Sequence, residues 1–367
     1  MSANLETIIW WLDKYLLPLH PIMKTKKKDI KAQYLLVAAA ACLIGIIGLS
    51  YYFFLTTFST SSETRYVYID TDDNLDSVLN KLTPIATEHG LMGFSTLMRH
   101  MDYAKRPRTG RYAIEPGENT VSVMRKMKNG QQVAIMLTIP ESRTMEKLAV
   151  TLGRKLMIDS VEIAMALTDN NYCQRWGYDT CTIAALFIPN TYEVYWNMSM
   201  DKLMERMVKE HTAFWNEERR AKAEAVGLTP NEVCTLASII DEETANTAEK
   251  PMIAGMYINR LQTGMPLQAD PTVKFAMKNF GLRRIYRDML TFDSPYNTYR
   301  NTGLPPGPIK IASIKGVEAV LNHVEHDFLY MCAKEDFSGT HNFAVTYNEH
   351  LRNAARYAAA LNRRGIK

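Results

Sequence analysis

The sequence of 367 residues predicts an α+β protein with a single N-terminal transmembrane helix, a small α/β module and a larger mixed α+β domain. Three observations support this: an uncharged apolar run, short alternating strand and helix patterns after it, and longer helical patterns in the rest of the chain. The predicted parts are an N-terminal segment over 1–33, a transmembrane helix over 34–55, a polar tether over 56–64, the module over 65–139 and the larger domain over 140–367.

The run from Tyr34 to Leu55 contains no charged residue and is long enough to cross a bilayer. A cleaved signal peptide is the alternative, but no clear small-x-small cleavage site follows, so we favour an uncleaved anchor. The lysines before the run outnumber charges just after it, which places the N-terminus in the cytoplasm. We therefore expect a single-pass protein of the inner (cytoplasmic) membrane, with the rest of the chain in the periplasm or outside the cell.

The first residues and the cysteines leave alternatives open. Met1 to Ile22 is either a membrane-surface segment or an over-extended start, with Met23 as the true first residue. Cys173 and Cys181 are either bridged or buried free thiols. The formal charge of +4 is modest and many basic residues sit in one short run, so no nucleic-acid partner is indicated.

In the module, periodicity predicts strands near 66–69, 110–114 and 132–139, and helices over 74–82, from 94 to 101, and over 120–130. Beyond it, a helix capped by Ser142 or Thr144 is predicted to run through Leu148 and Leu152. Short helices are predicted around 160–167 and 171–178, and a long amphipathic helix over 200–226. No internal repeat of solenoid length is present.

The stretch from Leu236 to Val273 organises the larger domain. Its first helix begins at Thr229-Pro230-Asn231-Glu232, which has a capping residue, a first-position proline and a capping-box acid. Val233, Leu236, Ala237 and Ile240 form one apolar stripe, and Glu243 lies one heptad beyond Leu236. Of the three consecutive acids we therefore expect only Glu243 to face the interior, where desolvation raises the pKa of a carboxyl group, while Asp241 and Glu242 point elsewhere. A solvated acidic helix end is the alternative.

Several separated motifs in one order resemble the endolytic murein transglycosylase family (MltG, YceG-like). They are ASIIDEET from Ala237, INRL from Ile258, LQADPTV from Leu267, YNTY from Tyr296 and GLPPGPI from Gly303. The resemblance is strongest from about Thr229 to His350. Two positions depart from the family pattern: Asp241 stands at the first acid of the run, and Asn190 replaces an aspartate after Pro189.

The resemblance implies that Glu243 is the catalytic acid of a peptidoglycan lytic transglycosylase that needs no cofactor. Such an enzyme cleaves the MurNAc-GlcNAc β-1,4 bond internally and leaves 1,6-anhydro-MurNAc ends. It also implies that the module is LysM-like, and that the protein limits glycan length during cell wall biogenesis and organization, near penicillin-binding synthases. A small spacer without ligand is the alternative for the module.

Five further residues are candidates for substrate binding: Gln268, Asp270, Tyr296, Asn297 and His341. Asp270 before Pro271 also suits a helix N-cap, and His341 also suits a structural hydrogen bond. Glu249 and Arg260 form an ion pair or position the catalytic carboxylate. His323 and His326 lack the spacing of a His-Glu-x-x-His motif, so no metal site is predicted.

Two other functions stay open from the sequence. The first is an envelope scaffold that binds peptidoglycan with Glu243 idle. The second is a glycoside hydrolase that uses water, with Glu243 as acid and Glu249 or Asp270 as base.

Overall fold

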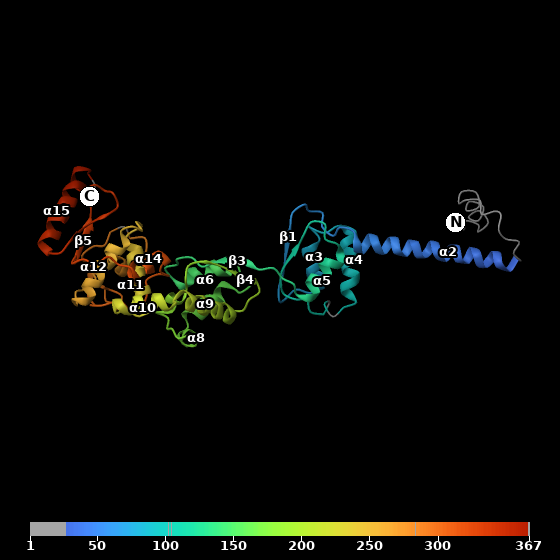
Figure 1. The fold of residues 1–367 in the computed structure, drawn as a ribbon, viewed down its shortest axis with the longest axis horizontal. Coiled ribbons are helices and arrows are strands. Elements are labelled where there is room, and N and C mark those ends of the chain that lie inside the picture. The colour runs from blue at the N-terminus through green and yellow to red at the C-terminus, as the bar shows by residue number, and fades with distance from the viewer. Residues whose placement is uncertain (1–26, 102, 104, 283, 366–367) are drawn as a thin grey trace. The chain divides into compact units, whose positions relative to one another are not determined.

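The computed structural model describes residues 27–101, 103, 105–282 and 284–365, drawn as ribbons in Figure 1. They form two compact units. The first contains the residues up to Arg108 together with Tyr112–Gln131, and the second contains Thr109–Arg111 and the chain from Gln132 onward. Most of the predicted N-terminal segment, including the residues from Met1 to Ile22 and the alternative start at Met23, lies outside the described residues.

The N-terminal apolar helix of the prediction is present. Helix α2 spans Lys27–Ser50 and continues into a π-helical turn, η1, at Tyr51–Leu55. The segment Lys31–Leu55 contains an 18-residue window with a mean hydropathy of 2.2, none of which is buried inside the protein. It is the one helix of the described residues long and apolar enough to cross a membrane. By length and composition it suits either an anchor or a signal sequence.

The prediction of a polar tether over residues 56–64 is wrong, because part of this segment packs into the first unit. Phe58 is fully buried in its core, and its backbone N–H donates to the Glu118 carbonyl at 2.7 Å. The turn η1 itself packs on α4 (Glu88–Arg99), where a Cβ at Gly93 would lie 2.3 Å from the Phe53 carbonyl oxygen. A buried aromatic side chain overrode the polar composition of this segment.

The first unit pairs β1 (Arg65–Ile69) with β2 (Gly110–Ile114) and packs three helices around them. Helix α3 (Leu75–Leu82) begins at a capping box on Asn74. Helix α5 (Thr120–Asn129) ends at Gly130, whose φ of 67° gives a left-handed cap. The predicted strands and helices of this unit are thus confirmed, except that α4 begins earlier than expected.

The third strand predicted for the module belongs to the second unit instead. Strand β3 (Ile135–Thr138) pairs antiparallel with β4 (Thr191–Val194), with Leu137 opposite Tyr192. Both side chains are buried in the core of the second unit. Pairing across this distance in sequence depends on tertiary contacts, so periodicity alone assigned the strand to the wrong partner.

The first half of the second unit packs mostly short helices against this strand pair. They are α6 (Met145–Gly153), α7 (Ser160–Thr168), α8 (Asn170–Gln174), the 3-10 turn η3 (Ile183–Leu186) and α9 (Met200–Phe214). Cys173 and Cys181 are free thiols, and the Cys173 thiol lies against the Leu167 carbonyl at 3.7 Å. The free-thiol alternative is therefore the one found here.

The single long helix predicted over 200–226 is wrong, because the chain breaks between α9 and α10 (Glu217–Val226). Trp215 lies at the break and is 1% exposed. The side chain of Asn216 accepts the Arg219 N–H at 2.9 Å and so starts α10 as a new helix. Burial of the indole and the new cap together outweigh the continuous amphipathic pattern.

The second half of the unit surrounds α11 (Pro230–Glu243). Its partners are α12 (Lys250–Gln262), α13 (Asp270–Ala276) and α14 (Ile314–Leu321), with η4 (Met289–Thr291) in the connection between α13 and α14. The hairpin of β5 (Tyr330–Ala333) and β6 (His341–Ala344) and the last helix α15 (Tyr347–Arg363) complete it. Figure 1 shows α11, α12 and α14 close together, so α11 is a central helix.

Candidate active site

Helix α11 begins where the sequence predicts. The Thr229 hydroxyl accepts the Glu232 N–H at 3.3 Å, and the Glu232 carboxylate accepts the Thr229 N–H at 2.8 Å. Pro230 occupies the first turn, where the missing N–H costs nothing. This local cap fixes the start of the helix and therefore the position of the three acids at its other end.

The three acids point to three different environments, and the expectation for Asp241 is wrong. The prediction assumed a helix with one buried stripe, but every residue from Val233 to Ile240 is buried, so α11 has no solvent side over this length. The Asp241 side chain is 2% exposed and that of Glu242 is 18% exposed. Other segments pack around α11 on all sides and bury Asp241, and the periodicity of the sequence does not predict this packing.

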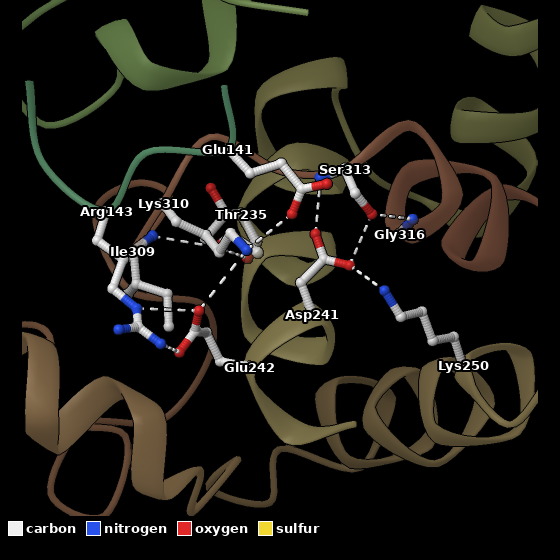
Figure 2. A network of polar contacts seen from close by, with 11 residues as sticks. Glu141, Arg143, Thr235, Asp241, Glu242, Lys250, Ile309, Lys310, Ser313 and Gly316 are labelled. Carbon is white, nitrogen blue, oxygen red and sulfur yellow. Dashed lines mark hydrogen bonds and ion pairs between the residues drawn. The ribbon is translucent and has the colours of Figure 1, made fainter. Parts of the chain in front are cut away.

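Asp241 ties α11 to two neighbouring helices, as Figure 2 shows. It forms an ion pair with Lys250, the first residue of α12, whose side chain is 9% exposed. It also accepts the Ser313 N–H at 2.6 Å and the Ser313 hydroxyl at 2.8 Å. A Cβ at Gly316 would lie 2.6 Å from the Asp241 carboxylate. Asp241 is thus a structural acid that closes the junction of α11, α12 and α14.

Glu242 pairs with Arg143 in a bidentate contact. The Arg143 Nε donates to one carboxylate oxygen at 3.1 Å and a terminal nitrogen donates to the other at 2.6 Å. Lys310 lies 3.6 Å from Glu242 and 2.9 Å from Glu141. Glu242 therefore joins α11 to the chain before α6, and its charge is already matched.

Glu243 has a different partner, and the pKa of its carboxyl group is raised. The Tyr257 hydroxyl, fully buried on α12, donates to Glu243 Oε1 at 2.8 Å. Glu243 is partly accessible, yet desolvation by the surrounding protein raises the pKa of its carboxyl group to about 7, against the lowering effect of the Tyr257 hydrogen bond. An accessible carboxyl group with a pKa near neutrality can hold and release a proton.

Asp270, at the start of α13, also acts on the pKa of Glu243. Its negative charge also raises the pKa of Glu243, while Lys274 and Arg260 lower that pKa. Its carboxylate accepts the Tyr299 hydroxyl at 2.6 Å. The N-cap of α13 is Ala269, so the capping role expected for Asp270 is wrong, and the acid stays exposed to solvent beside the site.

Of the two alternatives for Glu249 and Arg260, the ion pair does not form. Glu249 accepts the His341 backbone N–H at 2.6 Å and contacts the His341 ring at 2.9 Å. The Arg260 guanidinium instead donates to backbone carbonyls, at 2.6 Å for Leu329. Of the two roles weighed for His341, the structure places the residue in a hydrogen bond that joins β6 to α12.

The other predicted binding residues are dispersed. Asn297 is fully buried and its amide donates to the carbonyls of Leu290 and Phe292, so the structure does not bring it to the surface of the site. Gln268 is exposed with a left-handed φ of 51°. Tyr296 is half-buried and its ring lies 4.7 Å from that of Phe275.

A cleft of about 450 Å³ lies at the end of α13. Its wall includes Phe275, Phe280 and Tyr296, with Arg143 and Lys278 among the charged residues. A second, narrower hollow shares Arg143, Phe275 and Phe280 with it and is also lined by Lys274 and Glu242. The acid-bearing helix end therefore adjoins an aromatic cleft of a size suited to a small ligand group.

Sequence reasoning missed Tyr257 and Arg143, and it did not include Tyr299 among the candidate binding residues. Tyr299 belongs to the YNTY motif, so its aromatic and hydroxyl chemistry was the available signal. Tyr257 and Arg143 carry no such signal, because each reaches its acid only through helix packing. No group of His, Cys, Asp or Glu able to hold a metal occurs in the part of the chain that the structure describes.

The raised pKa of Glu243 predicts a pH-dependent stability. The folded pKa of about 7 exceeds the ordinary value of 4.5, so the folded state binds more protons and loses stability as pH rises from about 4.5 to 7. We expect Glu243→Gln, which mimics the protonated acid, to be more stable than wild type by on the order of 2–3 kcal/mol above pH 7 and equal to it near pH 4. Thermal unfolding at both pH values measures this, and equal stability above pH 7 would contradict it.

The candidate site is thus the end of a central helix in an α+β domain, where burial raises the pKa of the Glu243 carboxyl group. The comparison with known proteins makes this specific. The chain belongs to the YceG-like family, whose model matches residues 67–356.

Curated relatives of this chain are named endolytic murein transglycosylase. The one from Bacillus subtilis is 29% identical over 269 residues, which cover 69% of this chain and 74% of the relative. The one from Streptococcus pneumoniae strain R6 is 26% identical over 303 residues, covering 74% of this chain and 54% of the relative, so the match spans about half of that protein.

A solved structure agrees with the fold. The crystal structure of a YceG-like protein from Listeria monocytogenes has a TM-score of 0.53 and 25% sequence identity, covering 80% of this chain and 99% of that chain.

Proposed function

We propose that this protein is an endolytic peptidoglycan lytic transglycosylase with Glu243 as its general acid and base. Membership of the YceG-like family and relatives named endolytic murein transglycosylase support the reaction class. The observation that carries the role of Glu243 is its carboxyl group, which has a pKa of about 7 and a hydrogen bond from Tyr257, on a residue that is itself partly exposed.

The reaction then needs one carboxyl group in two protonation states. Protonated Glu243 donates its proton to the glycosidic oxygen as the bond to C1 of N-acetylmuramic acid breaks. The resulting carboxylate takes the proton of the C6 hydroxyl, whose oxygen bonds to C1 and closes the 1,6-anhydro ring. No water is consumed, and the intramolecular position of the hydroxyl replaces an external nucleophile. The Tyr257 hydroxyl stabilises the intermediate carboxylate and leaves the other oxygen to carry the proton.

The environment of the neighbouring acids favours this reaction over hydrolysis. An ordinary glycosidase needs a second carboxylate as base or nucleophile. Glu249 is 8% exposed and bonded to His341, which removes it from that role. Asp270 remains as a possible base, held by Tyr299, and in our proposal its charge instead helps to keep Glu243 protonated and its carboxylate binds substrate.

The cellular setting follows from the apolar helix and the family. We propose that Lys31–Leu55 anchors the protein once through the inner membrane, with the N-terminus in the cytoplasm and the catalytic unit outside it. There it would end nascent glycan strands beside penicillin-binding synthases. The first unit, for which the resemblance implies a LysM-like fold, would contact peptidoglycan.

Product chemistry tests the proposal. The detergent-solubilised full chain is incubated with purified glycan strands, and the fragments are analysed by mass spectrometry. We expect internal cleavage with 1,6-anhydro ends, which lack one water relative to reducing ends. Reducing ends would replace the proposal by a hydrolase, and intact strands that nevertheless bind the protein would replace it by a scaffold.

A further inference from the structure

We propose that the cleft at the end of α13 binds the peptide stem of the N-acetylmuramic acid residue, with Lys274 and Lys278 receiving the stem carboxylates. This inference rests on the proposed function and specifies its substrate as strands that carry peptides. The occupant is an acidic peptide branch, and the sugar chain alone would be too neutral to use these cations.

The cleft offers the apolar part of such a site. The rings of Phe275 and Tyr296 lie 4.7 Å apart and those of Phe275 and Phe280 lie 6.3 Å apart, which makes a continuous aromatic wall. The volume of about 450 Å³ suits a few amino-acid residues better than several sugar rings. Aromatic walls of this kind pack against the apolar parts of a bound peptide.

The charges around the cleft favour a carboxylate ligand. Arg143 lies over Phe280, 5.6 Å from the ring centre, but its charge is matched by Glu242. Lys278 lines the cleft and Lys274 lines the narrower hollow beside it. Because Glu242 is paired with Arg143, Glu146 is the remaining acid of the two linings. Two lysines against one acid leave the cleft and the hollow together with an excess of positive charge, which attracts an anionic group.

The backbone at Lys278 is unusual in a way that fits a binding role. Lys278 follows the end of α13 with a left-handed φ of 51°, a conformation that costs free energy for a residue with a Cβ. Its side chain is exposed, so burial of that side chain does not account for this conformation. The turn instead places Lys278 in the lining of the cleft.

Lys274 connects the cleft to the reacting acid. It lines the hollow beside Glu242, and its charge acts on Glu243 strongly enough to lower the pKa of that carboxyl group. A muramic acid whose C1 lies at Glu243 would therefore carry its side branch toward the aromatic wall. The lysines then help to place the sugar at the acid, and peptide-free strands lose that help.

The test compares cleavage of two substrates by the full chain in detergent. One is a glycan strand with its stem peptides, and the other is the same strand stripped of peptides by an amidase. For each protein the ratio of kcat/KM for peptide-bearing over stripped strands is measured. Lys278→Gln is the main variant because Lys278 is exposed and does not act on the pKa of Glu243. Lys209→Gln, at an exposed lysine of α9, is the matched control.

We expect wild type to prefer peptide-bearing strands and Lys278→Gln to lower the ratio by about three- to tenfold, the range between an exposed ion pair and a charge-assisted hydrogen bond. Lys209→Gln should leave the ratio at the wild-type value. Strands with amidated stem carboxylates should give wild type and Lys278→Gln the same ratio.

Equal cleavage of both strands by wild type, or a ratio unchanged in Lys278→Gln, would overturn the inference and assign the cleft to the sugar chain. Absence of 1,6-anhydro products from wild type with either strand is a separate result, which contradicts the proposed function itself.

Discussion

Glu243→Gln is expected to lower the formation of 1,6-anhydro ends by roughly 10³- to 10⁴-fold, because one amide cannot donate or accept the proton that both halves of the reaction need. The fold should persist, since the amide can still accept the 2.8 Å hydrogen bond from the Tyr257 hydroxyl. The rate of appearance of anhydro ends by mass spectrometry, with strand binding measured in parallel, separates lost chemistry from lost binding.

Glu242→Gln is the matched control, since it changes the adjacent acid on the same helix. The Glu242 carboxylate already pairs with Arg143, at 2.6 Å for the shorter contact, so its loss should leave most of the activity and cost a modest amount of stability. An inactive Glu242→Gln beside an active Glu243→Gln would reverse the assignment of the catalytic acid.

Asp241→Asn is expected to lower the free energy of unfolding of the second unit by about 3–5 kcal/mol, because it leaves the buried Lys250 ammonium without a compensating charge. The amide oxygen can still accept the Ser313 N–H, so part of the contact with the start of α14 is kept. For a unit of this size the loss corresponds to a fall in Tm on the order of 10 °C, measured by thermal unfolding.

Glu218→Gln provides the exposed counterpart, because Glu218 pairs with Lys222 at 2.8 Å on the surface of α10 with a side chain that is 71% exposed. Its effect on stability should be small, because solvent screens an exposed ion pair. Adding Lys250→Met to Asp241→Asn should recover part of the stability by removing the unpaired charge. A change in Tm no larger for Asp241→Asn than for Glu218→Gln would mean that the buried pair contributes little.

The comparison of the three acids separates what periodicity predicts from what packing decides. Glu243 lies where a helix with one buried stripe would carry it, and its partly shielded position agrees with that prediction. Asp241 was expected to face away, but α14 and α12 cover that side of α11 and supply Ser313 and Lys250. The period of 3.6 residues indicates which residues share a face of the helix. How many of those faces are buried depends on segments that are distant in the sequence.

The polar contacts in the site also depend on packing between distant segments. The Arg143–Glu242 contact joins residues 99 positions apart, and the Glu249–His341 contact joins residues 92 positions apart. Neither separation has a local pattern. A Glu249–Arg260 ion pair was one of two alternatives from the sequence only because both residues flank one helix. The proposed peptide-stem cleft was likewise invisible in the sequence, since its aromatic wall and its lysines come together only through the packing of α13 against its neighbours.

The sequence by itself determined the apolar span before residue 56, the capped start of α11 at Thr229, most helix and strand positions of the first unit, and the family. The span, the helix start and the elements of the first unit each depend on residues within a few positions of one another, where hydrophobic length and capping hydrogen bonds act locally. The family follows from several separated motifs in one order. The tertiary structure alone decided the pairing of β3 with β4, the break at Trp215, the burial of Asp241 and the shielding that sets the pKa of Glu243. Those features depend on which distant groups displace water from a side chain, and desolvation is a property of the packed interior rather than of any one segment.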